Sequence, residues 1–166
     1  MEKTIIDFSS PDEQDRWEII NDAVMGGLSE SRVLMTENKT ALFQGVLSLE
    51  NYGGFSSLRT HTGEFDLALY KGLMIRVKGD GKDYRLRLKM DTSFEGIAYQ
   101  VHFSTDQDKW TNARLPFDAF TPVFRGQVIE DAPNLDISGI KRIGFMIADK
   151  QAGPFRLEIH WIKGYS

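Results

Sequence analysis

The chain has 166 residues, of which 41% are hydrophobic, and this is enough for a single domain over residues 1–166 with a sizeable core. Twenty Lys and Arg against 24 Asp and Glu give a net charge of -4, so no general attraction to nucleic acid or to an anionic membrane is expected. The absence of cysteine excludes disulfides, thiolate metal sites and a cysteine nucleophile.

The amino terminus, MEKTIIDFSSPDEQ, has neither a long apolar stretch nor the Arg-rich character of a transit peptide. We therefore expect a cytoplasmic protein with no membrane insertion. Residues 4–8 form a β-prone run. The segment SSPDE then combines a serine cap, a proline at the first helical position and acidic residues in the first turn, which predicts one short helical turn.

Beyond Gly27 the pattern changes to short runs of alternating hydrophobic residues separated by Gly, Asn, Asp and Pro, which is typical of β-strands. The alternation is clearest in GLMIRVKGDGKDYRLRLKM. Its hydrophobic residues are Leu73, Ile75 and Val77, then Tyr84, Leu86, Leu88 and Met90. The turn residues 79–81 between the two halves predict a β-hairpin.

Further strands follow in IAYQVHF, in KWTNARLPF, in IKRIGFMIAD and in GPFRLEIHWIKGY. Residues 143–148 are all but continuously apolar and predict a central strand. In the last segment we expect Phe155, Leu157, Ile159 and Trp161 to point inward. About ten strands with this spacing predict an all-β sandwich or jelly roll. The expected core includes Phe43, Leu47, Ile75, Leu86, Leu88, Val101, Phe145, Leu157 and Ile159.

The polar positions of the middle strands are rich in cations. Alternation from the core residues leaves these side chains outside: Arg59, Arg76, Lys78, Arg85, Arg87, Lys89, Gln100 and His102. If the strands are neighbours, one sheet carries a continuous cationic surface. Forked Arg donors beside an amide suit an anionic or hydroxyl-rich ligand or an acidic protein partner. The alternative is a solvated outer face whose charges only favour solubility.

No arrangement of residues points to catalysis. His61, His102 and His160 lack the spacing of metal ligands, and neither a G-x-S-x-G segment nor a distinct pair of carboxylates is present. Acidic loops leave calcium binding open, although the EF-hand pattern is missing. The pairs Gly26-Gly27 and Gly53-Gly54 lack dinucleotide-binding spacing and predict turns with positive φ or a close chain crossing. We expect a non-enzyme without metal or cofactor.

Several motifs nonetheless occur together. The segment WEIINDAVMGGLSES contains Trp17, Asn21, Asp22, Val24, Met25, Gly26, Gly27 and Ser29. FQGVLSLENYGGFSSLRT, VKGDGKDYRLRL, LPFDAFTPVFRG and IGFMIADKQAGPFRLEI follow in that order. With these motifs in this order, the chain resembles the complex I intermediate-associated protein family over nearly its whole length.

The resemblance implies a β-sandwich similar to galactose-binding domains. It also implies the role of the mitochondrial members, which are assembly factors or chaperones for NADH:ubiquinone oxidoreductase, and it supplies no catalytic residues. Because the chain lacks their long amino-terminal extension, we expect a bacterial protein. The segment NDAVMGG is then a structural turn, in which Asn21 and Asp22 bond nearby backbone.

Two functions follow from these observations. The first is a non-catalytic, chaperone-like domain that holds a protein partner through the Arg-rich face, with Arg59, Arg76, Arg85, Arg87 and Gln100 on one surface. The second is a carbohydrate-binding module, for which Trp110 and Tyr99 are the candidate stacking platforms. By analogy with related sandwiches, in which end loops and a concave sheet face bind sugars, Asp22, Ser29, Arg59 and Arg125 are candidate contacts.

Overall fold

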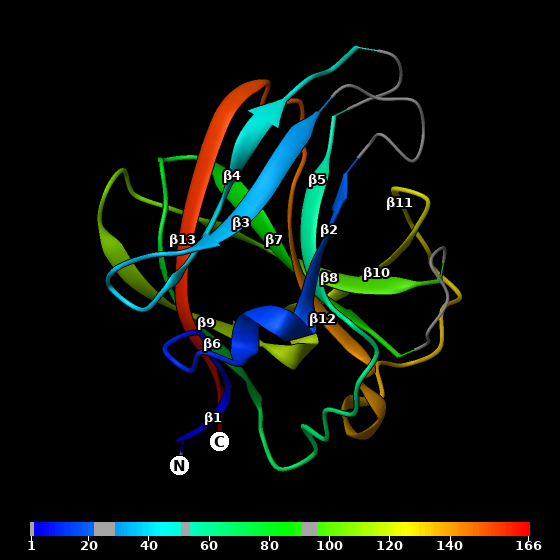
Figure 1. Cartoon of the computed structure of the whole chain (residues 1–166). Helices are drawn as coiled ribbons and strands as arrows, with labels where there is room; N and C mark the ends of the chain where they lie inside the picture. The colour runs from blue at the N-terminus through cyan, green and yellow to red at the C-terminus, as the bar shows by residue number, and fades with distance from the viewer. Residues whose placement is uncertain (1, 22–28, 51–53, 91–95) are drawn as a thin grey trace.

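The computed structural model describes residues 2–21, 29–50, 54–90 and 96–166. Its strands form two antiparallel sheets around one core (Figure 1), which confirms the predicted all-β sandwich. The six-stranded sheet has the order β3-β4-β13-β6-β9, with β1 also paired to β13. Its strands are β1 (Glu2–Asp7), β3 (Glu30–Met35), β4 (Ala41–Leu47), β6 (Gly72–Lys78), β9 (Trp110–Pro116) and β13 (Gly153–Tyr165).

The seven-stranded sheet has the order β11-β10-β8-β7-β12-β5-β2. Its strands are β2 (Trp17–Asn21), β5 (Ser56–Thr60), β7 (Asp83–Lys89), β8 (Ala98–Ser104), β10 (Thr121–Phe124), β11 (Gln127–Val128) and β12 (Arg142–Ile147). The predicted central strand is β12, which is buried from Ile143 to Ile147. Short 3₁₀ turns cover Glu13–Arg16, Phe117–Ala119 and Ile137–Gly139.

The predicted amino-terminal turn is therefore present as a single 3₁₀ turn. It follows Asp12, whose side chain makes no capping hydrogen bond, so the expected serine cap is wrong. Tertiary contact holds the turn instead. The buried carboxylate of Glu13 accepts a hydrogen bond from the indole nitrogen of Trp17 at 3.2 Å, and Trp17 packs on Phe8 with ring centroids 5.1 Å apart.

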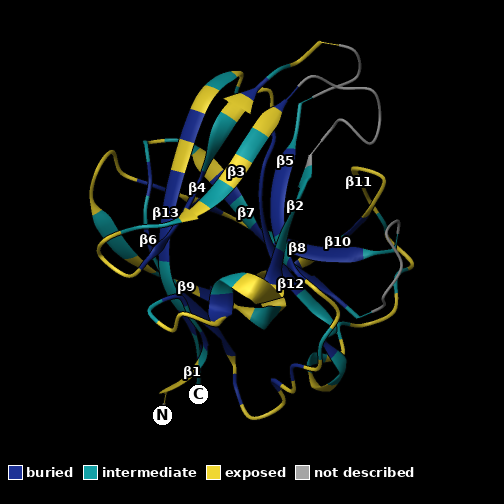
Figure 2. Cartoon of the chain, viewed as in Figure 1, coloured by how far each residue is buried: buried dark blue, intermediate teal, exposed yellow. Residues whose placement is uncertain are grey.

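The predicted core is confirmed in eight of its nine residues, and Val101 is half-buried at its margin. Figure 2 shows the buried positions running along both sheets where they face each other. Phe145 of β12 lies at the middle of an aromatic group, with ring centroids 6.2 Å from both Trp17 and Phe103. The alternation of β7 is also as predicted, because Leu86 and Leu88 are fully buried. Its arginines therefore point away from the core.

The predicted hairpin between β6 and β7 is wrong. β6 belongs to the six-stranded sheet and β7 to the seven-stranded sheet, so residues 79–82 carry the chain between sheets. Both strands point hydrophobic residues into the same core, and for that reason alternation could not distinguish this crossing from a hairpin. Asp80 holds the crossing in place: its carboxylate accepts hydrogen bonds from the Tyr84 hydroxyl and from the backbone nitrogen of Arg156, each at 2.9 Å.

β13 changes register in its middle. Its pairing with β6 shifts between Ile159 and Trp161. Every second residue up to Ile159 points inward, but the next inward residue is Ile162. The prediction that Trp161 points inward is therefore wrong. Trp161 lies half-buried, with Nζ of Lys163 4.2 Å from its ring centroid. A bulge adds one residue to a strand and so reverses the sides that its later residues face.

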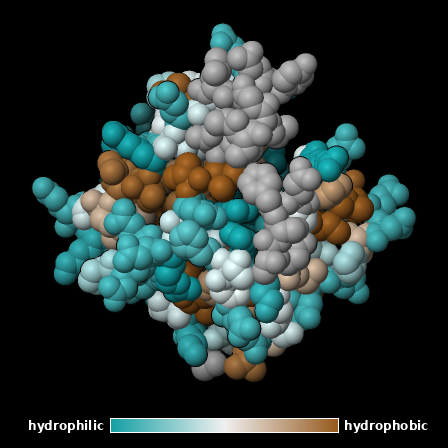
Figure 3. Space-filling view, turned by 45° about the vertical axis from the view of Figure 1, so that its right-hand side comes forward, coloured by the Kyte–Doolittle hydropathy of each residue, from teal (hydrophilic) through white to brown (hydrophobic). Residues whose placement is uncertain are grey.

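On the surface shown in Figure 3, hydrophobic side chains gather in a few groups among hydrophilic ones. The large hydrophobic residues that the structure shows exposed are Leu34, Val46, Leu49, Leu69, Phe124 and Val128. Within the described residues, no helix is long and apolar enough to cross a membrane.

Candidate binding face of the seven-stranded sheet

Four of the predicted binding residues share the outer face of the seven-stranded sheet. Arg59 of β5 and Arg87 of β7 both pair with Gly144 of β12, which lies between them. Gln100 of β8 pairs with Arg87 on the other side, and Arg85 lies two residues along the same strand. These four residues, Arg59, Arg85, Arg87 and Gln100, are called the arginine face below.

Acidic side chains lie at two borders of this face. Glu18 of β2 accepts a hydrogen bond from Nε of Arg59 at 2.9 Å, and the same oxygen accepts one from Nη1 of Arg142 at 3.1 Å. On the other side, Arg85 forms an ion pair with Asp149, and Nε2 of His102 lies 3.4 Å from the same carboxylate. Each acid thus balances charge at a border and leaves the centre positive.

The environment of these acids affects their ionisation. Partial burial alone would raise the pKa of Glu18, but hydrogen bonds and charge from Arg59, with His61 and Arg142, hold it below its ordinary value. Asp149 behaves alike: burial opposes ionisation, while Arg85 and His102 together keep its pKa lowered. Both carboxylates are therefore charged at neutral pH.

Arg87 differs from its neighbours. Its Nε is buried and makes no hydrogen bond to any residue that the structure describes, and no ion pair joins Arg87 to a described acid. Burial, together with the charges of Arg85 and Arg59, lowers the pKa of the Arg87 guanidinium to about 10. The centre of the face is therefore a sheltered cation whose charge is not balanced by the described part of the protein.

Arg76 does not belong to this face. It lies on β6, in the other sheet, and its prediction as part of one continuous surface is wrong because β6 and β7 are not paired. Its guanidinium lies 4.9 Å from the ring centroid of Trp110, and Nη1 donates to Asn112 Oδ1 at 3.1 Å. The alternation of hydrophobic residues correctly predicted which side chains of each strand point outward. It carried no information on the sheet to which each strand belongs.

The remaining predicted contacts are dispersed. Ser29 is only 3% exposed and joins two chain segments, since its hydroxyl accepts from the backbone nitrogen of Ser48 at 2.9 Å. This gives Ser29 a structural role. Arg125 forms the exposed β10–β11 turn with Gly126, both at positive φ, and in the sheet order β8 lies between β10 and the strand of Arg87. Asp22 lies outside the described residues, as does the pair Gly26-Gly27.

The prediction for the second glycine pair is confirmed at Gly54, whose φ is +123°. Sequence reasoning missed four residues of the arginine face and its borders: Glu18, Arg142, Asp149 and Gly144. Arg142 and Gly144 alternate with the core residues of β12, as the arginines do in β7. Because β12 was predicted to be covered on both sides, neither residue was assigned to a polar face. Glu18 and Asp149 reach the face only through non-local strand pairing.

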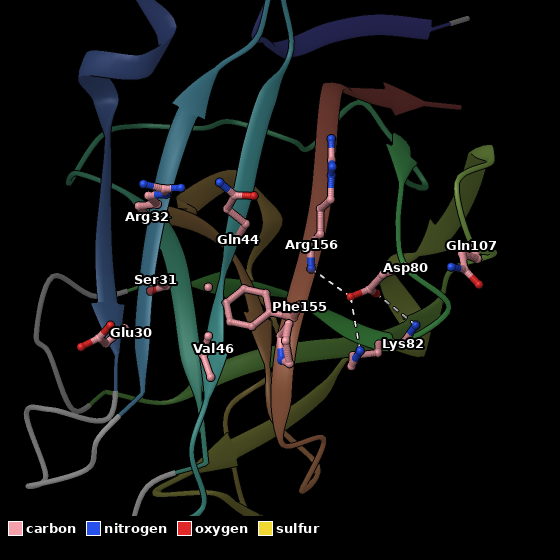
Figure 4. Close-up of a pocket in the computed structure, with 12 residues that line it drawn as sticks. Glu30, Ser31, Arg32, Gln44, Val46, Asp80, Lys82, Gln107, Phe155 and Arg156 are labelled. Atoms are coloured by element: carbon pink, nitrogen blue, oxygen red, sulfur yellow. Dashed lines mark hydrogen bonds and ion pairs between the residues drawn. The ribbon is translucent and has the colours of Figure 1, made fainter.

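A hollow lies on the six-stranded sheet (Figure 4). Arg32, Gln44 and Arg156 are cross-strand neighbours on β3, β4 and β13, and Lys82 and Asp80 approach from the sheet crossing. Two of the cations here have partners close by. Asp80 lies 3.5 Å from Nζ of Lys82, and Gln44 can accept two hydrogen bonds of 3.2 Å from Arg32.

As the structure describes them, neither the arginine face nor this hollow shows groups arranged for catalysis. No cluster of His, Asp and Glu suited to a metal ion is found among the described residues. At the borders of the arginine face His102 lies near Asp149 and His61 lies 3.5 Å from Glu18, and no described hydroxyl hydrogen-bonds to His102 as an activated nucleophile would.

Comparison with known proteins identifies the family. Residues 6–159 match the family model described as Complex I intermediate-associated protein 30 (CIA30). The chain belongs to the CIA30 family. It is 29% identical over 180 residues to mouse "Complex I intermediate-associated protein 30, mitochondrial", covering 96% of this chain and 55% of that protein. For the Drosophila melanogaster protein of the same name, the identity is 26% and the coverages are 95% and 61%.

The chain therefore spans little more than half the length of these CIA30 relatives. They are eukaryotic and speak against the expectation of a bacterial protein. Their names place them in mitochondria, so the cytoplasmic expectation gains no support from them.

Solved structures agree on the fold of this CIA30 chain. A family 11 carbohydrate-binding module from a cellulosomal cellulase of Clostridium thermocellum superposes with a TM-score of 0.74 at 17% identity, over 100% of this chain and 95% of the module. An agarase gives 0.68 at 10% identity, over 99% of this chain and 24% of the enzyme. At these identities the likeness shows a shared jelly-roll fold, as galactose-binding-like domains have. It carries no information about ligands.

Proposed function

We propose that this chain is a non-catalytic, chaperone-like binding domain that holds a protein partner through the arginine face and the adjoining loops. By membership of the CIA30 family, the partner class is an assembly intermediate of complex I, the association for which its relatives are named. A binding role needs no reacting groups. It needs a surface that is left unsatisfied until the partner arrives.

Arg87 carries the proposal. A sheltered guanidinium without a described acidic partner raises the free energy of the folded chain, and an acidic group on a partner would remove that cost. The border acids, Glu18 and Asp149, already pair with other arginines. An incoming acid therefore meets its strongest attraction at the centre of the face, where specificity is best achieved.

Carbohydrate binding, the alternative function, has weaker support. Trp110 lies on the other sheet, and its ring has Arg76 and Lys78 at 4.9 and 5.5 Å from the centroid, where a sugar would stack. Tyr99 is 2% exposed and belongs to the core. The arginine face, as far as the structure describes it, offers no aromatic platform.

The experiment is affinity capture of complex I subunits from mitochondrial extracts by the tagged chain. Arg85 and Arg87 are both replaced by Glu in one variant. The matched control replaces Arg76 and Arg114, on the outer side of the other sheet, by Glu, so that the charge change is equal. We expect the first variant to lose capture and the control to retain it, and we expect capture by the unmodified chain to weaken with salt.

Melting temperatures of both variants show whether each is folded. Equal capture by both variants would exclude the arginine face. A glycan array run in parallel tests the alternative: binding to neutral oligosaccharides, undiminished in the Arg85→Glu, Arg87→Glu variant, would contradict a protein-binding role for this face.

A further inference from the structure

The middle of the arginine face is occupied by a residue without a side chain, Gly144. This glycine stands between Arg59 and Arg87 in the same cross-strand row, so their backbones are about 10 Å apart, twice the spacing of neighbouring strands. An added Cβ would lie 3.0 Å from the backbone oxygen of Leu58 and 3.1 Å from Cβ of Arg59. Both distances are shorter than an ordinary van der Waals contact, so there is no room for a side chain here, and only buried backbone lies between the two guanidinium-bearing residues in this row.

The side chains beside Gly144 on β7 and β8 offer hydrogen-bond donors. Arg87 presents N–H groups that no described residue accepts, including its buried Nε. Gln100 is 8% exposed and directs its carbonyl oxygen to Nη1 of Arg85 at 3.4 Å, which leaves its amide N–H groups for another acceptor. A ligand that hydrogen-bonds to these N–H groups and matches the positive charge must carry acceptor atoms and a negative charge.

We propose that Gly144, Arg87 and Gln100 form a subsite for one carboxylate, supplied by an aspartate or glutamate side chain of the protein partner. This inference rests on the proposed function and specifies its chemistry. A carboxylate is planar and accepts two parallel hydrogen bonds from a guanidinium, and no side chain on Gly144 competes for the guanidinium of Arg87. Arg59 and Arg85 flank the subsite with positive charge and are held in place by Glu18 and Asp149.

The stability of a variant at position 87 distinguishes an arginine kept for binding from one kept for the fold. The lowered pKa of Arg87 means that the folded chain disfavours its charge at neutral pH. Replacing Arg87 by Met keeps an unbranched side chain, although a shorter one, and removes the charge. Arg87→Met should therefore raise the melting temperature while abolishing carboxylate binding, as expected where function is kept at the expense of stability.

The test uses two peptides, Ac-Gly-Glu-Gly-Glu-Gly-amide and its counterpart with Gln for Glu, titrated into the full chain. Binding is followed through the side-chain Nε–Hε resonances of arginine. We expect the Glu peptide alone to bind and to shift the resonance of Arg87, and we expect Arg87→Met to weaken binding at least tenfold. Arg76→Met, on the other sheet, should bind like the unmodified chain. Arg87→Gln serves as a second variant if Arg87→Met folds poorly.

Equal binding of the Glu and Gln peptides, or unchanged binding in both Arg87 variants, would overturn the subsite. Binding of inorganic phosphate or of an oligogalacturonate, with no binding of the Glu peptide, would overturn it too and would assign this part of the face to another anion. If the subsite fails while capture of complex I subunits still depends on the arginine face, the proposed function stands. If both fail, the face is not the binding surface.

Discussion

The outer faces of the two sheets both carry cations but use them differently. On the six-stranded sheet several cationic side chains lie over rings or beside polar partners: Arg76 and Lys78 over Trp110, Lys163 over Trp161, Arg114 over Tyr165, and Lys78 also beside Glu158. On the seven-stranded sheet, Arg87 is sheltered between Arg59 and Arg85, and the described chain does not balance its charge.

This contrast shows that the number of positive charges does not identify a binding face. A solvated cation over an aromatic ring is already stabilised in the free protein, by about 0.5–1 kcal/mol. An incoming acid must compete with that contact. A desolvated cation without a partner gains the full interaction when the acid arrives, and for that reason we place recognition on the seven-stranded sheet.

The largest expected effect on stability comes from neighbouring residues of β7, which alternate between the core and the arginine face. Leu86→Ala should lower the free energy of unfolding by about 2–5 kcal/mol, because Leu86 is fully buried. Its neighbour Arg87 should respond in the opposite direction when replaced by Met. Chemical denaturation measures both, and a loss of stability in both variants would show that Arg87 supports the fold as Leu86 does.

The next effect compares a glycine from each sheet. In β4, a Cβ on Gly45 would lie 2.0 Å from the backbone oxygen of Glu30, so Gly45→Ala must displace β3 and should cost about 3 kcal/mol or more. Gly144→Ala meets its nearest atoms at 3.0 and 3.1 Å and should cost about 1 kcal/mol.

The measurement is again the free energy of unfolding, combined with the Glu-peptide titration. Gly144→Ala should weaken peptide binding beyond its effect on stability, whereas the fraction of Gly45→Ala that remains folded should bind normally. The reverse order of binding losses would contradict the place that we assign to Gly144 in the carboxylate subsite.

A smaller effect concerns the acid at the border of the arginine face. Because the pKa of Glu18 is lowered on folding, its ionised form stabilises the native state above the ordinary value of 4.5, and this contribution is lost as the pH falls through and below that value. Glu18→Gln should therefore lower stability by about 1 kcal/mol or less at pH 7, and by progressively less as the pH falls below 4.5 and the carboxylate of the native state becomes protonated. Thermal unfolding at falling pH is the measurement, and a difference that does not shrink as the pH falls would remove the ionic explanation.

The smallest effect belongs to the six-stranded sheet. Arg76→Ala removes the contact with the Trp110 ring and the hydrogen bond to Asn112, both near the surface, and should cost about 0.5–1 kcal/mol. Binding of the partner and of the Glu peptide should not change. A clear loss of binding in Arg76→Ala would show that the two faces do not differ in the way described.

Much of this architecture could be predicted from local patterns. Alternation in β7 and β8 correctly assigned Leu86 and Leu88 to the core and Arg85, Arg87 and Gln100 to one outer side. A period of two residues is a property of any strand with one buried side, so the sequence contains that information directly.

Other features depend on contacts between distant residues and left no local signal. The crossing at residues 79–82 looks like a hairpin turn, because a turn shows where the chain reverses but not which strand it then pairs with. Nothing near Gly144 in the sequence indicates that β5 and β7 flank it. The bulge beside Trp161 likewise needed the register with β6 to be seen. The motif around Asp22 lies outside the described residues, and its role stays a prediction.

The position of β13 has a consequence for synthesis of the protein. This last strand runs through the six-stranded sheet and pairs with β1, β4 and β6, so three strands made earlier depend on it for a neighbour. A nascent chain that has exposed residues 2–150 to solvent still lacks the strand that joins them. Pairing of the six-stranded sheet can therefore be completed only after the segment from Gly153 to Tyr165 has left the ribosome, and until then the edges that β13 covers are open to aggregation.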